Sequence, residues 1–372
     1  MRLSKFNIYI QEDDNVTIYN TLSRMKECIT DVQFRRLTAE EDLKNEKLES
    51  ELYEKEIICE KEIDETKIYF YKLNRDIHLK DCLTIIFDMT LKNNTTFSQK
   101  FLCRSISVID YLREILGVKK VEVDIWIDEI TTNSEKILES IECLRRKTKQ
   151  LKLKITMNSI DDIRFAEIKK FKIDIISIRM IKNREKIIQV LEMGIEIEVE
   201  LTSKNLREIR KILLEIPMKY RKKVKVVNRC FQMYSETLAY NTKESIMDEV
   251  YLLKKAGYDM SFWKKELFSC VAQQDTFLLI DKSGKLYKCP FYKKKSSKEI
   301  GNIFDTFERI LQQTLASDSS KGSYEKSAKC LQCKVLPLCN GGCYINKKST
   351  ENSICKKEEY IKTFCDVIEN GE

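Results

Sequence analysis

Residues 119–127 read KKVEVDIWI, and they are followed by the helical pattern EKILESIECLRR at 135–146 and the next apolar run, LKLKITM, at 151–157. This alternation of a short β-branched run and an amphipathic helix recurs through the middle of the chain. The apolar runs lie at 83–88, 119–127, 151–157, 173–181, 195–201 and 224–228. Six strand–helix units in succession predict a parallel α/β sheet.

The position of the glycines indicates which kind of parallel sheet the chain forms. The chain has nine glycines, and only Gly117, Gly194 and Gly257 precede Tyr258. Neither G-x-G-x-x-G nor G-x-x-x-x-G-K-[ST] occurs, so the phosphate-binding turns of Rossmann and P-loop proteins are absent from the sequence. A partial (β/α)6 barrel over 82–260 is therefore favoured over a dinucleotide-binding sheet.

Composition excludes several classes of protein. Of the 372 residues 42% are hydrophobic, which excludes wholesale disorder, and the net charge of +8 is spread among 34% charged residues. Such a mixed surface predicts no nucleic-acid partner, and the lack of a long apolar run predicts no membrane span. The N-terminus is charged too early for a signal peptide, so a cytoplasmic location is expected. In that compartment clustered cysteines indicate metal more often than disulfides.

Residues 1–81 form the first predicted region, a small α+β unit. FNIYI at 6–10 and VTIYN at 16–20 predict a β-hairpin. Thr38 and Glu41 have capping-box spacing ahead of a predicted helix that carries leucines at 43, 48 and 52. The region shows no catalytic pattern, and peptide recognition is the role considered for it.

Residues 261–372 differ in composition from the rest of the chain. Eight of the fourteen cysteines and six of the nine glycines lie here. Seven cysteines have the spacing C-x13-G-x4-C, a gap, C-x2-C-x5-C-x3-C, a second gap and C. Gly284 is predicted at a hairpin tip that needs positive φ, and Gly341 and Gly342 at a tight bend. Thiolates so arranged suit zinc or an iron–sulfur cluster, and spacing alone leaves both open.

The C-terminal motifs resemble those of a known domain. GKLYKCP at 284–290, GNI at 301–303 and CNGGC at 339–343, together with the cysteine spacing, closely resemble the SPASM domain of radical SAM peptide and protein maturases. The resemblance implies two auxiliary [4Fe–4S] clusters. It assigns Cys270, Cys289 and Cys343 to the first, and Cys330, Cys333, Cys339 and Cys355 to the second. A fourth protein ligand of the first cluster is left open, with Cys230 and Cys365 as candidates.

The barrel region resembles the catalytic part of the same family but lacks its defining residues. The C-x3-C-x2-C motif that follows the first strand in the family falls here on Leu91, Thr95 and Ser98. The G-G-E-P loop that receives S-adenosylmethionine (SAM) falls on Ile127, Asp128 and Glu129. The resemblance therefore implies a degenerate member that is not expected to bind SAM.

These observations favour a function without SAM chemistry. The predicted protein is a pseudo-radical-SAM iron–sulfur protein that binds or presents a ribosomally synthesised precursor peptide, with an active radical SAM maturase as its partner. Electron transfer through the auxiliary clusters is a second hypothesis. An active maturase with an unconventional SAM cluster and a zinc-stabilised scaffold are two further ones. The sequence does not identify the peptide or its modification.

Overall fold

The computed structural model describes most of the chain. The described residues are 1–78, 80–90, 98–127, 132–148, 150–160, 165–181, 183–201, 206–228, 252–260, 271–289, 299–315, 328–341, 357–358 and 361. They form two compact units. Unit 1 comprises Met1–Leu79, Lys264–Gln273 and Lys321–Glu372, and unit 2 comprises Lys80–Trp263 and Gln274–Ser320. The predicted third region, 261–372, is thus divided between the two units.

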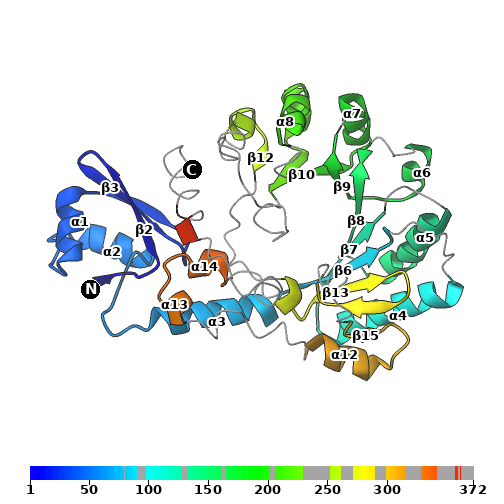
Figure 1. Ribbon diagram of the computed structural model, residues 1–372, viewed down its shortest axis with the longest axis horizontal. Coiled ribbons are helices and arrows are strands. Elements are labelled where there is room, and N and C mark those ends of the chain that lie inside the picture. Colours follow the sequence, from blue (N-terminus) through cyan, green and yellow to red (C-terminus); the bar gives the residue numbers. More distant parts are fainter. Residues whose placement is uncertain are drawn as a thin grey trace. The chain divides into compact units, whose positions relative to one another are not determined.

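Unit 2 is a mixed α/β unit built on one large, mostly parallel sheet (Figure 1). The strand order is β12-β11-β10-β9-β8-β7-β6-β13-β14-β15. All six predicted strands are confirmed, and each pairs in parallel with the next one along the chain. The strands are β6 (Cys82–Asp88), β7 (Lys120–Trp126), β8 (Gln150–Ser159), β9 (Ile175–Met180), β10 (Glu196–Leu201), β11 (Val224–Asn228), β12 (Asp259–Met260), β13 (Phe277–Asp281), β14 (Lys285–Tyr287) and β15 (Gly301–Asn302).

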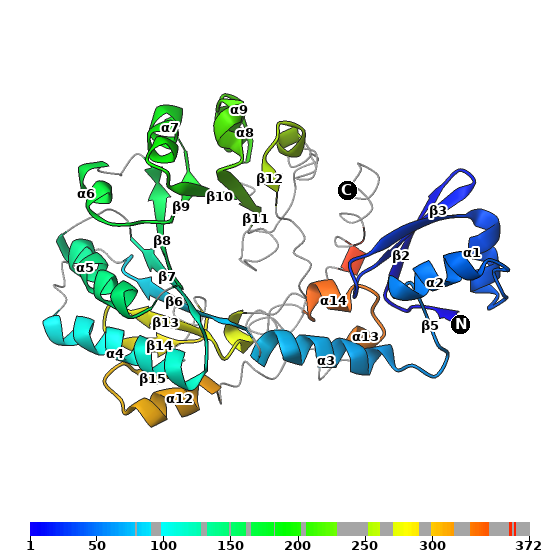
Figure 2. The same cartoon turned by 180° about the vertical axis from the view of Figure 1, so that it is seen from behind.

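Helices cover the convex side of this curved sheet (Figures 1 and 2). They are α4 (Gln99–Ile115), α5 (Thr132–Lys147), α6 (Phe165–Lys170), α7 (Arg184–Glu192), α8 (Leu206–Leu214), α9 (Met218–Arg221) and α12 (Phe307–Leu315). Among the described helices, none in either unit is long and apolar enough to cross a membrane.

The main hydrophobic core lies between the helices and one face of the sheet. Alternate strand residues such as Phe87, Ile125 and Ile155 are buried in it together with Val108 of α4 and Ile141 of α5. Because successive side chains of a strand point to opposite faces, the residues between these apolar ones face the other way. The sheet therefore has an apolar outer face under the helices and a second, inner face.

The predicted C-terminal hairpin belongs to this sheet. β13 pairs in parallel with β6, and β14 pairs with β13 in antiparallel fashion. Gly284 at the tip has φ +82°, as predicted, and a Cβ atom there would lie 2.7 Å from Cγ2 of Ile303. The Asp281 side chain accepts hydrogen bonds from the backbone N–H groups of Ser283 and Lys285, which closes the turn.

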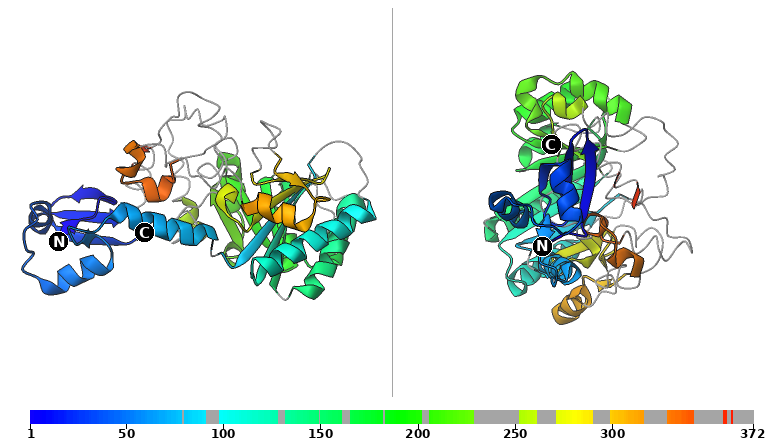
Figure 3. Two further views of the ribbon diagram at one scale, coloured as in Figure 1. Left: turned by 90° about the horizontal axis from the view of Figure 1, so that it is seen from below. Right: turned by 90° about the vertical axis from the view of Figure 1, so that its left-hand side faces the viewer.

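Unit 1 joins the N-terminal region to C-terminal helices. The predicted hairpin is confirmed as β2 and β3, which pair throughout their length, and β4 completes a three-stranded antiparallel sheet. Figure 3 shows α13 and α14 near α3. The elements are β1 (Arg2–Leu3), β2 (Asn7–Glu12), β3 (Asn15–Asn20), β4 (Lys26–Thr30), α1 (Asp31–Thr38), α2 (Glu46–Glu54), β5 (Ile58–Cys59), α3 (Glu65–His78), the 3₁₀ turn η2 (Val271–Gln273), α13 (Ala328–Leu331) and α14 (Leu336–Cys339).

The capping box predicted at Thr38 and Glu41 was wrong. Thr38 is the last residue of α1, and its hydroxyl donates to the carbonyl of Phe34. The capping box instead opens α1, where Thr30 and Gln33 exchange hydrogen bonds. The next helix begins after Asn45, whose side chain accepts from the Leu48 N–H (3.1 Å). The pairs Thr30/Gln33 and Thr38/Glu41 both have the spacing of a capping box. The backbone conformation of the folded chain decides which pair caps a helix.

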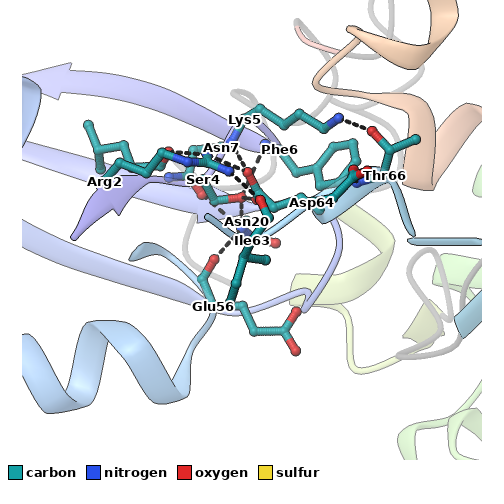
Figure 4. Close-up of polar contacts among 12 residues, drawn as sticks. Arg2, Ser4, Lys5, Phe6, Asn7, Asn20, Glu56, Ile63, Asp64 and Thr66 are labelled. Carbon is teal, nitrogen blue, oxygen red and sulfur yellow. Dashed lines mark hydrogen bonds and ion pairs between the residues drawn. The ribbon is translucent and has the colours of Figure 1, made fainter. Parts of the chain in front are cut away.

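A buried polar network ties the first strand of unit 1 to the start of α3 (Figure 4). The Glu65 carboxylate is 5% exposed and accepts hydrogen bonds from the Arg2 guanidinium (2.7 Å), the Ser4 hydroxyl and the Lys5 N–H (3.1 Å). The Asn20 amide donates to Ser4 (2.9 Å). A buried carboxylate is tolerated because each of these donors compensates part of its lost hydration.

Candidate functional site

The inner face of the unit 2 sheet carries buried polar side chains. Register aligns one row of them across the strands: Asp281, Asp88, Trp126, Thr156, Ser177, Glu198 and Lys225. Several of these are almost fully buried; Ser177 is 0% and Thr156 3% exposed. The row lies at the carboxyl ends of β6, β7 and β13 and in the first half of β9, β10 and β11. Barrel enzymes place their binding groups at the carboxyl ends of the strands.

Lys154 stands at the centre of an ion-pair network on this face. Its ammonium lies 2.8 Å from the Glu198 carboxylate and 3.9 Å from that of Asp124, and all three side chains are buried. Asp124 also accepts hydrogen bonds from the Thr156 hydroxyl (2.7 Å) and the Trp126 indole N–H (3.0 Å). The network joins β7, β8 and β10 through side chains alone.

A second charged pair lies on the same face, one register row nearer the strand ends. The Arg179 guanidinium donates to the buried Glu200 carboxylate (3.0 Å) and lies 5.9 Å from the centre of the Trp126 ring. Ser177 donates to the other oxygen of Glu200 (3.3 Å). Arg179 is the more open partner, with a side chain 35% exposed against 1% for Glu200. The inner face thus offers oriented donors and acceptors to a polar ligand.

The polar inner face is visible in the sequence as an alternation of apolar and charged residues along the strands. Parallel strands buried on both sides are usually continuous apolar runs. Here β7, β8 and β10 alternate strictly, as in VEVDIW and EIEVEL. The charged positions of these strands fall on one face, so the alternation by itself predicts a polar lining.

Of the positions that align with the SAM-site residues of the family, 98 and 127 are among the described residues. Ser98 is the N-cap of α4, and its hydroxyl accepts the Phe101 N–H (3.1 Å). Ile127 follows β7, is 4% exposed and packs in the main core. Leu91, Thr95, Asp128 and Glu129 lie outside the described residues.

Three of the predicted metal ligands lie on one short stretch of unit 1. Cys330 is in α13, Cys339 ends α14, and Cys333 lies between the two helices. The Cys333 N–H donates to the Cys330 carbonyl (3.0 Å), which forms the C-x2-C turn. After Cys339 the chain turns through left-handed φ values at Asn340 (+47°) and Gly341 (+69°), as the glycine pattern predicted for Gly341. Thiolate sulfur is the kind of ligand that zinc and iron–sulfur clusters take, and these three cysteines lie within ten residues of sequence.

Cys289 lies in unit 2, two residues beyond β14, and is buried. Beside it, the Lys288 ammonium donates to the backbone carbonyls of Gln274 (2.5 Å) and Phe277 (2.9 Å). Burial lowers the pKa of Lys288 to about 7.

The remaining predicted ligands, Cys270, Cys343 and Cys355, lie outside the described residues, as do Cys230 and Cys365. Within the described part of the chain no three histidine, cysteine, aspartate or glutamate side chains form a metal-binding group. Each ligand set implied by the resemblance includes at least one residue outside that part, so the assignment stays a prediction.

Sequence comparison gives a partial match. No protein-family model matches the chain. A stretch of 92 residues, 24% of the chain, is 27% identical to the cysteine-type anaerobic sulfatase-maturating enzymes of two strains of Clostridium perfringens. The match spans about a quarter of the length of these curated relatives.

Solved structures match over much more of the chain. Streptococcus suis SuiB aligns with 95% of this chain and 97% of its own, with a TM-score of 0.51 at 14% identity. SuiB bound to the precursor peptide SuiA gives a TM-score of 0.51 at 15% identity, over 94% of this chain and 97% of its own. Native anSMEcpe with bound AdoMet covers 77% of this chain and 96% of its own, with a TM-score of 0.54 at 17% identity. The chain has the fold of these proteins. Together with the sequence match, this supports the resemblance to radical SAM maturases.

Replacement of Lys154 by methionine tests the ion-pair network of the inner face. The variant keeps most of the length of the side chain but leaves the carboxylates of Asp124 and Glu198 without their shared ammonium. We expect the free energy of unfolding to fall by about 3 kcal/mol, because removal of one partner of a buried ion pair leaves the remaining charges uncompensated. Urea unfolding followed by circular dichroism measures the change. Lys152→Met is the matched control, since Lys152 lies two residues earlier on the same strand and is exposed. Equal midpoints for the two variants would contradict the network.

Proposed function

We propose that this protein is a radical-SAM-like iron–sulfur protein without SAM chemistry of its own, which binds or presents a ribosomally synthesised precursor peptide while a separate, active radical SAM maturase modifies it. One combination of features carries the proposal. The fold of the maturases extends over nearly the whole chain, yet leucine, threonine and serine stand at 91, 95 and 98, where the family has three cysteines. Leucine has no atom that can bind iron.

Peptide binding is supported by a neighbour and by two surfaces of this chain. SuiB has the same fold and has been solved with its precursor peptide SuiA. Among the described strands of unit 1, the sheet order β2-β3-β4 places β2 and β4 at the edges, and an edge strand can pair with an extended peptide. In unit 2 the Arg179 guanidinium, which is 35% exposed on the inner face, can donate hydrogen bonds to carbonyl or carboxylate groups of a peptide.

The proposed cofactors are two auxiliary [4Fe–4S] clusters, and no SAM. On the SPASM pattern the first would be held by Cys270, Cys289 and Cys343. The second would be held by the remaining four SPASM cysteines, Cys330, Cys333, Cys339 and Cys355. When bound, such clusters supply one-electron storage and transfer. Electron transfer to the partner enzyme is accordingly the second candidate function, and the seven retained cysteines are the observation that favours it.

Metal analysis tests the cluster assignment. Protein reconstituted under anaerobic conditions is expected to bind about eight irons per chain, the content of two four-iron clusters. Iron, sulfide and zinc are measured on the same sample. About twelve irons would indicate a third cluster and overturn the degenerate SAM site. Stoichiometric zinc without iron would overturn the iron–sulfur assignment.

The lack of SAM chemistry is tested by the formation of 5′-deoxyadenosine under strong reductant. We expect no more product from the reconstituted protein than from a preparation stripped of iron. A variant with cysteine at 91, 95 and 98 should also stay inactive, because the glycines of the SAM-binding loop are missing at 127 and 128. Product above the stripped control would favour the active-maturase alternative.

Peptide presentation is tested with the full chain and short peptides encoded next to its gene. Fluorescence anisotropy of labelled peptides is expected to show saturable binding in the absence of SAM. Metal-free protein then separates the two candidate functions in an assay with the partner maturase. If metal-free protein still binds peptide and supports modification, presentation is favoured. Modification that requires the clusters, with no peptide binding, would overturn presentation in favour of electron transfer.

A further inference from the structure

A chain of three buried side chains joins distant parts of unit 1. The Tyr69 hydroxyl in α3 donates to the Asn340 side-chain oxygen (2.9 Å), and the Asn340 amide nitrogen donates to the Gln273 side-chain oxygen (2.9 Å). The residues are 0%, 4% and 6% exposed, respectively. Because a buried amide is costly unless it is hydrogen-bonded, both ends of Asn340 are fixed by these contacts.

Asn340 is also fixed by its backbone. Its φ and ψ of 47° and 37° are left-handed, and its N–H donates to the Leu336 carbonyl (2.8 Å), which ends α14. Asparagine adopts this conformation more readily than other residues with a side chain. Cys339 directly precedes Asn340, and Cys270 lies three positions before Gln273. The Tyr69–Asn340–Gln273 chain therefore fixes Asn340, the residue next to Cys339, which is a predicted ligand of the second cluster.

Other side chains of the N-terminal region hold the same cysteine stretch. The Lys5 ammonium donates to the Leu331 carbonyl (3.2 Å), the Thr21 hydroxyl to that of Lys334 (2.5 Å) and the Arg24 guanidinium to that of Pro337 (3.3 Å). Leu336 packs in a cluster with Phe6, Leu22, Tyr69, Leu73 and Ile77, and Cys330 and Cys333 lie against it. Stretch 328–341 is thus anchored to the N-terminal region at several points along its length.

We propose that Tyr69 is a positioning residue for the metal-binding cysteines, and that metal occupancy and the order of the N-terminal region are thermodynamically linked. The proposal rests on the metal centres of the proposed function. A metal that binds only the ordered cysteine stretch stabilises everything that holds the stretch in place. By the same linkage, loosening the stretch from α3 weakens metal retention.

The test compares Tyr69→Phe with Tyr71→Phe. Both remove one hydroxyl from α3, but Tyr69 is buried and Tyr71 is 71% exposed. We expect reconstituted Tyr69→Phe to lose iron to a chelator about tenfold faster than wild type, the lower end of the effect of removing a residue that supports metal ligands. Tyr71→Phe should match wild type. Gln273→Met removes the other hydrogen bond of Asn340 and should act in the same direction as Tyr69→Phe.

Hydrogen exchange of the metal-free proteins gives a readout that needs no cluster. In Tyr69→Phe the amides of Leu336, Cys339 and Asn340 should exchange faster than in wild type, while those of the β2–β3 hairpin should not change. Faster exchange with unaltered iron loss would overturn the link to metal. Unaltered exchange would overturn the positioning role itself. If wild-type protein binds no metal at all, the cluster assignment fails and the link to metal fails with it. The exchange data then still test whether Tyr69 holds stretch 328–341 in place.

Discussion

Burial of the apolar face of the β6–β11 sheet under helices α4–α8 is the interaction on which unit 2 depends. The strands present isoleucine, valine and leucine to the helices at every second position, and these side chains form one continuous core. The period of two then sends the intervening residues to the inner face. Charges placed there are shielded from water, so they have to pair with one another, as Lys154 does with Asp124 and Glu198.

Unit 1 follows a different principle, because it joins segments from the two ends of the sequence. Side chains of the first 80 residues hold backbone carbonyls of 328–341. Backbone groups that are buried away from water need such partners, and here the N-terminal region supplies them. A short stretch with three cysteines and two four-residue helices has little stability of its own. Its order depends on the region that it packs against.

The core of unit 2 and the anchoring of stretch 328–341 in unit 1 both depend on side chains of this chain alone. The sheet and its helices need no cofactor to bury their core, and the polar inner face is satisfied by its own ion pairs. The cysteine stretch is anchored in part through its backbone carbonyls, which accept hydrogen bonds from Lys5, Thr21 and Arg24. The proposed presenting role, in which the chain uses no SAM, is compatible with these contacts, because the described core and ion pairs are made by protein side chains.

Local pattern in the sequence was enough to predict the six parallel strands, the β2–β3 hairpin and the turn at Gly284, because periodicity and turn chemistry act between near neighbours. It placed a capping box at Thr38 ahead of the second helix, which is capped by Asn45 instead, and it missed the box at Thr30 that opens α1. The polar inner face was present in the strict alternation of β7, β8 and β10, but which charges would meet could not be predicted, because pairing across strands depends on register. Tyr69 and Asn340 are 271 positions apart. The sequence by itself determined that position 340 is an asparagine, whose amide needs hydrogen-bond partners if it is buried. Only the tertiary structure decided that α3 and η2 provide these partners, because the packing of unit 1 brings the segments together.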